Sequence, residues 1–132
     1  RSSESCILQP FRGGTRLLLA LFDLDRLILL DTSNPRKPVL LDLYQFPKGT
    51  GGHVVRVSRN ERLLALATYF LEEGAAGQIH APGDCTIRFL QLDAQGRRFI
   101  RDPWPYARGP TINFTEIAPG KGGFRTHGIA FL

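Results

Sequence analysis

The chain has 132 residues, of which 42% are hydrophobic and 22% charged, so it can bury the core of one domain and is not intrinsically disordered. Its net charge of +5 comes mostly from arginines scattered over turns and strand edges without interleaved aromatic residues, so we expect no nucleic-acid partner. Charged residues interrupt the longest apolar stretch, residues 17–30, which is too short to span a bilayer, so we expect no membrane insertion.

Short apolar runs separated by turns follow one another along the chain. Fourteen glycines and nine prolines in this length favour an all-β fold. A turn over Asp31–Pro35 separates the third run from the fourth. The predicted strands cover residues 6–10, 15–21, 26–31, 39–46, 53–57, 61–67 and 86–92.

Two segments are similar to each other, Thr15–Leu21 and Glu61–Ala67, and the second begins 46 residues after the first. A period of about 40–50 residues with four strands is typical of a β-propeller blade. We therefore predict a partial β-propeller, with about two four-stranded antiparallel blades plus the first strand of a third. The predicted boundaries are 5–46 for blade one, 52–114 for blade two and 127–132 for the start of the next blade, with insertions in blade two at 72–84 and 103–110. A small β-sandwich with an accidental repeat is the alternative.

Two blades cannot close a propeller, because such folds need about four to eight. The open sheet faces and edges predict a partner, which is either the remainder of a propeller chain or a second copy of this one. The chain contains no methionine, and we expect it to be a piece of a longer protein. A cytoplasmic and a periplasmic location both agree with the sequence.

All three histidines and one of the two cysteines are predicted to lie on one face of this fold. His53 and His127 open first strands, His80 lies in the loop after a second strand, and Cys85 begins a third strand. Imidazole and thiolate together suit copper or zinc, so these four residues are the candidate metal ligands. Each taken alone also has a structural explanation, as a hydrogen-bonded histidine or a buried thiol. A bridge between Cys6 and Cys85 is a further possibility.

Several segments, in order along residues 26–132, resemble the selenium-binding protein family. They are Gly52–Val57, Arg62–Leu64, Tyr69–Gly74, Gly77–Asp84 and the final Arg125–Phe131. Members of that family are much longer, so the chain would correspond to a late portion of a full propeller. The resemblance implies a methanethiol oxidase, which converts methanethiol with oxygen and water to formaldehyde, hydrogen sulfide and hydrogen peroxide. It also implies copper as cofactor, a small thiol as substrate and His53, His80 and His127 as ligands.

The chain departs from the family at two positions where a histidine is common, which here are Cys85 and Arg88. A thiolate can bind Cu(I), but a guanidinium stays protonated and cannot be a ligand. Asp84 is a candidate proton acceptor or partner of a ligand, although capping a turn is its simpler role. Enzymatic activity is therefore open, and a propeller that binds metal or selenium without turnover, or that binds a protein partner, is the alternative.

Overall fold

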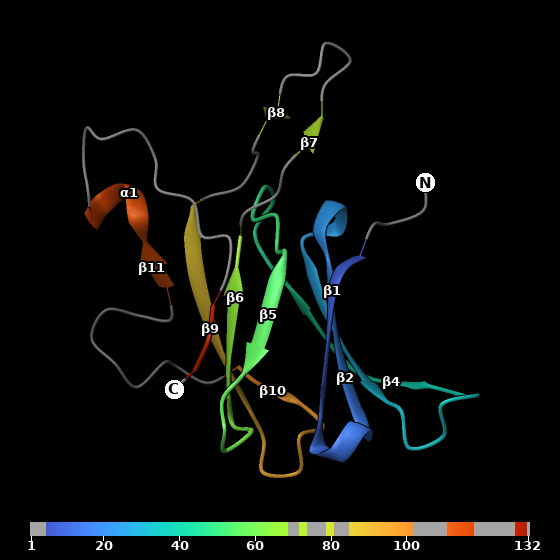
Figure 1. Cartoon of the computed structure of the whole chain (residues 1–132). Coiled ribbons are helices and arrows are strands. Elements are labelled where there is room, and N and C mark those ends of the chain that lie inside the picture. Colours follow the sequence, from blue (N-terminus) through green and yellow to red (C-terminus); the bar gives the residue numbers. More distant parts are fainter. Residues whose placement is uncertain are drawn as a thin grey trace.

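The computed structural model describes residues 5–68, 72–73, 79–80, 85–101, 111–117 and 129–131, and within them two antiparallel sheets lie next to each other (Figure 1). The first sheet contains, in spatial order, β1 (Ser5–Phe11), β2 (Arg16–Leu21), β3 (Arg26–Asp31) and β4 (Val39–Gln45). The second contains β5 (Val54–Val57), β6 (Leu63–Ala67), β9 (Thr86–Leu92), β10 (Phe99–Ile100) and β11 (Thr111–Asn113). A separate ladder pairs β7 (Glu72–Glu73) with β8 (Ile79–His80), and a short helix, α1 (Phe114–Ile117), follows β11.

The first sheet is a simple meander whose turns have recognisable chemistry. A 3₁₀ turn over Arg12–Gly14 joins β1 to β2, and Gly14 there has a φ of 84°, which favours glycine. In the β3–β4 turn, the Asp31 carboxylate accepts the Ser33 N–H at 2.9 Å and Asn34 Oδ1 accepts the Arg36 N–H at 3.2 Å. These side-chain contacts replace backbone hydrogen bonds, which is why aspartate and asparagine stand at these positions.

The fourth-strand position of the second sheet is divided between two short strands. Phe99 of β10 pairs with Leu92, and Thr111 of β11 pairs with Arg88 further along the same strand, β9. Both short strands are antiparallel to β9, so the second sheet repeats the up-and-down order of the first. The prediction of an all-β fold built from antiparallel sheets is confirmed, with four strands in the first sheet and five in the second. Of the predicted 127–132 strand, residues 129–131 carry no strand, and the others lie outside the described residues.

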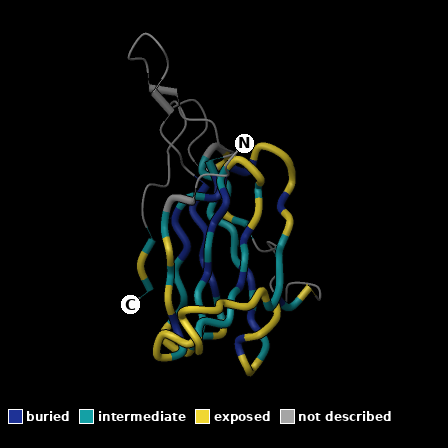
Figure 2. Tube along the Cα trace, turned by 90° about the vertical axis from the view of Figure 1, so that its right-hand side faces the viewer, coloured by how far each residue is buried: buried dark blue, intermediate teal, exposed yellow. Residues whose placement is uncertain are grey.

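The two sheets share one hydrophobic core, and Figure 2 shows the buried residues along the central strands and the exposed ones in the turns. Leu18, Leu27 and Leu29 of the first sheet are 0% exposed, as are Val55 and Leu92 of the second. Burial of this apolar surface is the main term that stabilises the pair of sheets. The complete cluster is Phe11, Leu18, Ala20, Leu27, Leu29, Phe46, Val55, Leu64, Leu66, Leu90, Leu92 and Phe99.

In the structure the two hairpins repeat with a spacing of 47 residues, one more than the 46 residues that separate the two similar sequence segments. At the first hairpin Phe11 pairs with Arg16, and at the second hairpin Ser58 pairs with Leu63. Each residue of the second pair lies 47 positions after its equivalent in the first pair. A shift of one residue moves every side chain of a strand to the opposite face. Leu18 therefore corresponds to Ala65, which lies on the face of the second sheet turned away from the first.

The sheets have two different ends. The turn end carries the hairpin turns at residues 12–15, 58–62 and 93–98. The linker end carries the β2–β3 turn, the linker 46–53, the end of β6 and the start of β9. Figure 1 places β7 and β8 beyond the linker end. In the described part of the chain, no helix is long and apolar enough to cross a membrane.

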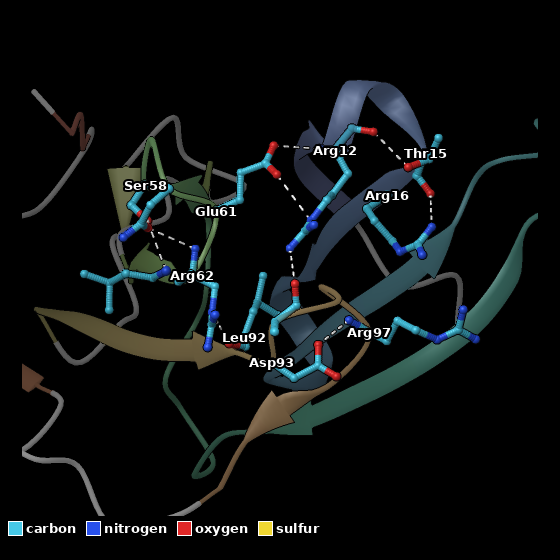
Figure 3. A network of polar contacts seen from close by, with 12 residues as sticks. Arg12, Thr15, Arg16, Ser58, Glu61, Arg62, Leu92, Asp93 and Arg97 are labelled. Carbon is cyan, nitrogen blue, oxygen red and sulfur yellow. Dashed lines mark hydrogen bonds and ion pairs between the residues drawn. The ribbon is translucent and has the colours of Figure 1, made fainter.

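At the turn end, polar contacts tie the first sheet to the second (Figure 3). The backbone N–H of Arg12 donates to Glu61 Oε1 at 2.8 Å, and its Nε lies 3.3 Å from Glu61 Oε2. The same guanidinium donates to the carbonyl oxygen of Ala94 at 2.6 Å. Arg12 thus bridges the turn before β6 and the turn after β9, so it connects three hairpins.

A second polar contact joins β4 to β10. Asp42 Oδ2 accepts the Phe99 N–H at 2.8 Å and an Arg101 N–H at 3.0 Å, while Oδ1 accepts a second Arg101 N–H at 2.8 Å. Burial opposes ionisation of Asp42, but the hydrogen bonds from Arg101 and from the backbone of Phe99 and Leu43 outweigh it, so the pKa of Asp42 is lowered. This bidentate contact fixes the outer strands of the two sheets to each other.

Candidate functional site

The four predicted ligands are described to different extents. His53 directly precedes β5, Cys85 directly precedes β9, and both lie at the linker end. His80 is in β8, where its backbone pairs with Glu72. His127 and the candidate proton acceptor Asp84 lie outside the described residues.

His53 is held in place by its backbone. Its N–H donates to the carbonyl oxygen of Ala67 at 2.9 Å, which extends the β5–β6 ladder by one residue. The residue before it, Gly52, lies so close to Leu66 that an added Cβ would be 3.0 Å from Leu66 Cδ2. A side chain at position 52 would therefore displace the core leucine or the backbone that leads to His53. The His53 side chain is half-buried, and its Nδ1 is inaccessible to solvent.

The linker that leads to His53 is fixed by Asp25, a residue that sequence reasoning missed. Asp25 Oδ2 accepts the Gly49 N–H at 2.9 Å, and Oδ1 accepts the Gly51 N–H at 2.8 Å. Asp25 itself has a φ of 51°, a left-handed conformation that aspartate tolerates better than most residues. The carbonyl oxygen of Asp25 also accepts the Phe46 N–H at 2.8 Å. The sequence did contain a signal for this role, because Asp25 lies between two leucine-rich strands. An aspartate at such a place is best explained by hydrogen bonds to nearby backbone groups.

Next to His53 on the other side of β6, two threonines form a buried hydrogen-bonded pair that the sequence analysis also missed. Thr68 is 0% exposed and Thr86 is 4% exposed. The Thr68 hydroxyl accepts the Thr86 N–H at 2.9 Å and donates to the Thr86 carbonyl oxygen at 3.0 Å. This side chain satisfies the backbone of β9 where β6 ends, so it sets the position at which β9 begins.

Cys85 adopts an unusual backbone conformation at that starting point. Its φ is 53°, and its carbonyl oxygen accepts the Phe114 N–H at 3.2 Å. A non-glycine residue in this region is uncommon and is kept there by its surroundings, here the end of β11. The thiol is free and the residue is half-buried, so Cys85 takes part in no disulfide.

The structure brings His53 and Cys85 to the same end of the same sheet. One strand, β6, separates β5 from β9, so the two backbones lie two strand spacings apart, about 10 Å. In a regular strand, His53 would share the face of Val55, which is turned toward the first sheet. Cys85 would share the opposite face, that of Ile87, although its left-handed φ interrupts the alternation.

The donor types suit copper, because imidazole and thiolate both bind it. In the part of the chain that the structure describes, however, no three histidine, cysteine, aspartate or glutamate side chains form a group that could hold a metal ion. Among the described residues, therefore, at most two of the predicted ligands come together, and they do not by themselves make a metal centre.

Arg88 lies close to this region on β9. It pairs with Leu66 on one side and with Thr111 on the other, and it is half-buried. Its position in the strand is on the face that Leu90 shares, which is turned toward the first sheet. A permanently charged guanidinium here disfavours a cation nearby.

A groove of about 500 Å³ runs along a different part of the second sheet. It is lined by Arg56 and Arg59 from the β5 region, by Gln9 of β1 and by residues 129–131. Neither His53 nor Cys85 lines it. The candidate metal ligands and this groove are thus separate features of the structure.

No model of a known protein family matches the chain, and no curated protein matches it. Two solved structures are similar in fold. A protein from Lactobacillus plantarum has a TM-score of 0.63 at 13% identity, over 90% of this chain and 28% of its own. A hypothetical selenium-binding protein from Sulfolobus tokodaii has a TM-score of 0.62 at 16% identity, over 83% of this chain and 26% of its own. The chain thus spans about a quarter of each of these structures and has a partial β-propeller-like fold.

Proposed function

We propose that the chain is part of a propeller protein that binds a small thiol at the linker end and oxidises it as a methanethiol oxidase. The reaction consumes one methanethiol, one O₂ and one water, and it gives formaldehyde, hydrogen sulfide and hydrogen peroxide. The carbon loses two electrons and O₂ gains them to become peroxide. The carbon–sulfur bond breaks, water supplies the oxygen of formaldehyde, and the sulfur leaves as hydrogen sulfide.

The observation that supports this proposal most is the convergence of chain segments at the linker end. His53 enters β5 there, and Cys85 enters β9 on the other side of β6. The segment that carries His80 connects the end of β6 to Cys85, and Cys85 follows His80 by only five positions. An extended chain of five residues reaches at most about 18 Å, which keeps His80 within range of this end.

In this proposal, His53, His80, Cys85 and His127 would hold a copper ion. Copper would supply the one-electron chemistry that links thiol oxidation to O₂ reduction. The chain itself would orient the imidazole of His53 through Gly52 and the Asp25-bound linker. Asp84, the neighbour of Cys85 in sequence, is the proposed acceptor of the substrate thiol proton. The half-buried position of Cys85 would limit the access of water.

The test is elemental analysis of the purified protein after incubation with copper. We expect near-stoichiometric copper in the unchanged chain and a loss in the His53→Ala and His80→Ala variants. Arg98→Ala is the matched control, because Arg98 is exposed and lies at the turn end. Circular dichroism shows whether each variant keeps its sheets. A folded chain that takes up no copper contradicts the metal site, and peroxide release from methanethiol tests the reaction separately.

Arg88 favours a second candidate function, a propeller that binds a metal or a selenium compound without turnover. A cationic side chain stands where the resembling family commonly has a histidine, and it is half-buried in β9. The S. tokodaii protein of similar fold is described as a hypothetical selenium-binding protein. Copper uptake without peroxide release would support this function. Restoring peroxide release with Arg88→His would show instead that one residue separates binding from turnover.

A further inference from the structure

The groove of about 500 Å³ lies where an edge strand of the first sheet, β1, meets an edge strand of the second, β5. Gln9 of β1 lines it from one side, and Arg56 and Val57 of β5 line it from the other. Arg59 and residues 129–131 complete the described lining. Small-molecule sites commonly have volumes of about 300–1,000 Å³, so the groove has the size of such a site.

The described residues that line this groove include two cations and no carboxylate. Arg56 is half-buried and Arg59 is exposed, and within the described part of the chain neither forms an ion pair. Arg16, by contrast, has a carboxylate oxygen of Asp31 at 3.1 Å from its Nη1. A half-buried charge is unfavourable without a counter-charge, so the positive groove favours an anion.

The hydrogen bonds of Arg56 leave one side of its guanidinium open. Nη1 donates to the carbonyl oxygen of Val55 at 2.9 Å and lies 3.5 Å from Gln9 Oε1. The Gln9 side chain is itself held by a 2.8 Å bond from its Nε2 to the carbonyl oxygen of Pro10. Nε and Nη2 of Arg56 have no hydrogen-bond partner among the described residues. These two nitrogens form one side of the planar fork, which is the geometry that binds a carboxylate through both oxygens.

The second cation stands on a turn whose backbone is fixed. Asn60 Oδ1 accepts the Ser58 hydroxyl at 2.7 Å and the Arg62 N–H at 3.1 Å, and Arg59 lies within this turn. The Arg59 side chain is exposed, so water and salt weaken its attraction for an anion more than they weaken that of Arg56. We therefore expect Arg56 to contribute most of the affinity and Arg59 to contribute less.

The remaining part of the lining is mainly apolar. Val57, Ile129 and Phe131 are all half-buried and line the same groove as the two arginines. A simple inorganic anion would leave these side chains uncovered, whereas a molecule with an apolar body beside its charge would cover them. The lining thus combines one charged contact, which sets the orientation of a ligand, with apolar surface, which adds affinity.

We propose that this groove binds a small organic carboxylate, with its two oxygens at Nε and Nη2 of Arg56 and its apolar body against Val57 and Phe131. A carboxylate is favoured over a phosphate because the open side of Arg56 offers two donors in one plane. The site is independent of the proposed copper centre and of thiol oxidation, since neither His53 nor Cys85 lines the groove.

The test is an NMR titration of the 132-residue chain with phenylacetate at about pH 7, where the acid is ionised. Phenylacetamide has nearly the same shape without the charge, and acetate has the charge without the ring. Both are expected to bind at least about tenfold more weakly than phenylacetate. Phenyl phosphate carries the same ring on a phosphate group and is expected to bind no more tightly than phenylacetate.

Three variants locate the bound molecule. Arg56→Gln is expected to raise the dissociation constant of phenylacetate about tenfold or more, and Arg59→Gln about threefold or less. Arg56→Lys keeps the charge but not the planar fork, so it should recover only part of the loss. Arg98→Gln is the matched control, because it removes the same charge from an exposed residue that does not line the groove. Circular dichroism shows whether each variant is folded.

Four outcomes overturn the proposal. The first is a folded, unchanged chain that binds no phenylacetate. The second is equal binding of phenylacetate and phenylacetamide, which needs no variant and therefore holds even if Arg56→Gln does not fold. The third is an equal loss of affinity in Arg56→Gln and Arg98→Gln, which would show only non-specific attraction to a basic protein. The fourth is binding of phenyl phosphate at least about tenfold tighter than that of phenylacetate, which would identify the groove as a phosphate site instead.

Discussion

The two ends of the sheet pair are held together by different kinds of polar contact. At the linker end, side chains bind backbone groups: Thr68 bonds to the backbone of Thr86, and Asp25 binds two N–H groups of the linker. At the turn end, ion pairs such as Arg12–Glu61 join the sheets, and their side chains are 32% and 34% exposed. The difference matters because water and salt weaken exposed ion pairs, whereas a buried hydrogen bond to the backbone is costly to lose.

The difference in polar contacts between the two ends agrees with the residues that each end holds in place. The linker end places His53 and Cys85, whose backbones must hold their geometry for any binding function. The turn end holds hairpin turns against each other and carries no predicted ligand. We therefore expect substitutions at the linker end to cost more stability and to change the environment of His53. Substitutions at the turn end should cost less and should depend on salt.

The largest effect is expected from Thr68→Val. The variant keeps the shape of the side chain but removes the acceptor for the buried Thr86 N–H, which should lower the free energy of unfolding by about 1–3 kcal/mol. Urea denaturation measures the change. Thr68→Ser retains the hydroxyl and should recover most of the loss. Thr15→Val is the control at the turn end, where the exposed Thr15 hydroxyl donates to the carbonyl oxygen of Arg12, and it should cost less than about 0.5 kcal/mol. Equal effects at both ends would contradict the contrast.

Asp25→Ala should have the next largest effect, about 1–2 kcal/mol, because it removes both acceptors for the linker N–H groups of Gly49 and Gly51. The more informative readout is the NMR signal of the His53 imidazole, which should shift or broaden when the linker is released. Asp25→Asn keeps one side-chain oxygen and should have an intermediate effect. An unchanged His53 signal in a folded Asp25→Ala variant would show that the linker does not position this residue.

The sequence predicted the fold class but not the register, and the reason is visible in β2. The run Leu17-Leu18-Leu19-Ala20-Leu21 is apolar on both faces, with Leu18 and Ala20 in the core and Leu17 and Leu19 on the opposite face. An alternating pattern would have fixed the repeat, whereas a continuous apolar run fits two registers that differ by one residue. The spacing of 46 was therefore as compatible with the sequence as the observed 47.

Only part of the candidate site could be predicted from the sequence. Strand order alone places His53 and Cys85 at one end of the sheet, and it did so correctly. It could not predict the left-handed backbone of Cys85, since glycine and asparagine are the usual signals for that conformation. Nor could it predict the Thr68–Thr86 pair, because threonine is also an ordinary strand residue and its hydroxyl becomes informative only when the position is known to be buried.

Asp42 links stability to pH where β4 contacts β10, and a smaller effect is expected there. Its pKa is lowered in the folded chain, so its contribution is complete above the ordinary aspartate value of about 4 and is lost as the pH falls through the lowered pKa. Asp42→Asn should therefore reduce the difference in melting temperature between pH 6 and pH 3. The variant and the unchanged chain should converge at low pH, where both carry a neutral side chain. A constant difference over this range would show that the contact with Arg101 acts through shape and not through charge.

The smallest effect is expected from Glu61→Gln. Glutamine keeps an oxygen for the Arg12 N–H but removes the charge facing the guanidinium, so the loss should be below about 1 kcal/mol. Because the pair is about one-third exposed, the loss should shrink further in 1 M salt, where the Debye length falls to about 3 Å. Urea denaturation at low and high salt measures both values, and Thr68→Val provides the comparison, since its neutral hydrogen bonds should respond little to salt. The contrary result is a Glu61→Gln variant that loses as much free energy of unfolding as Thr68→Val at both salt concentrations. The Arg12–Glu61 ion pair would then stabilise the fold as much as the buried threonine pair does, and the contrast between the two ends would be wrong.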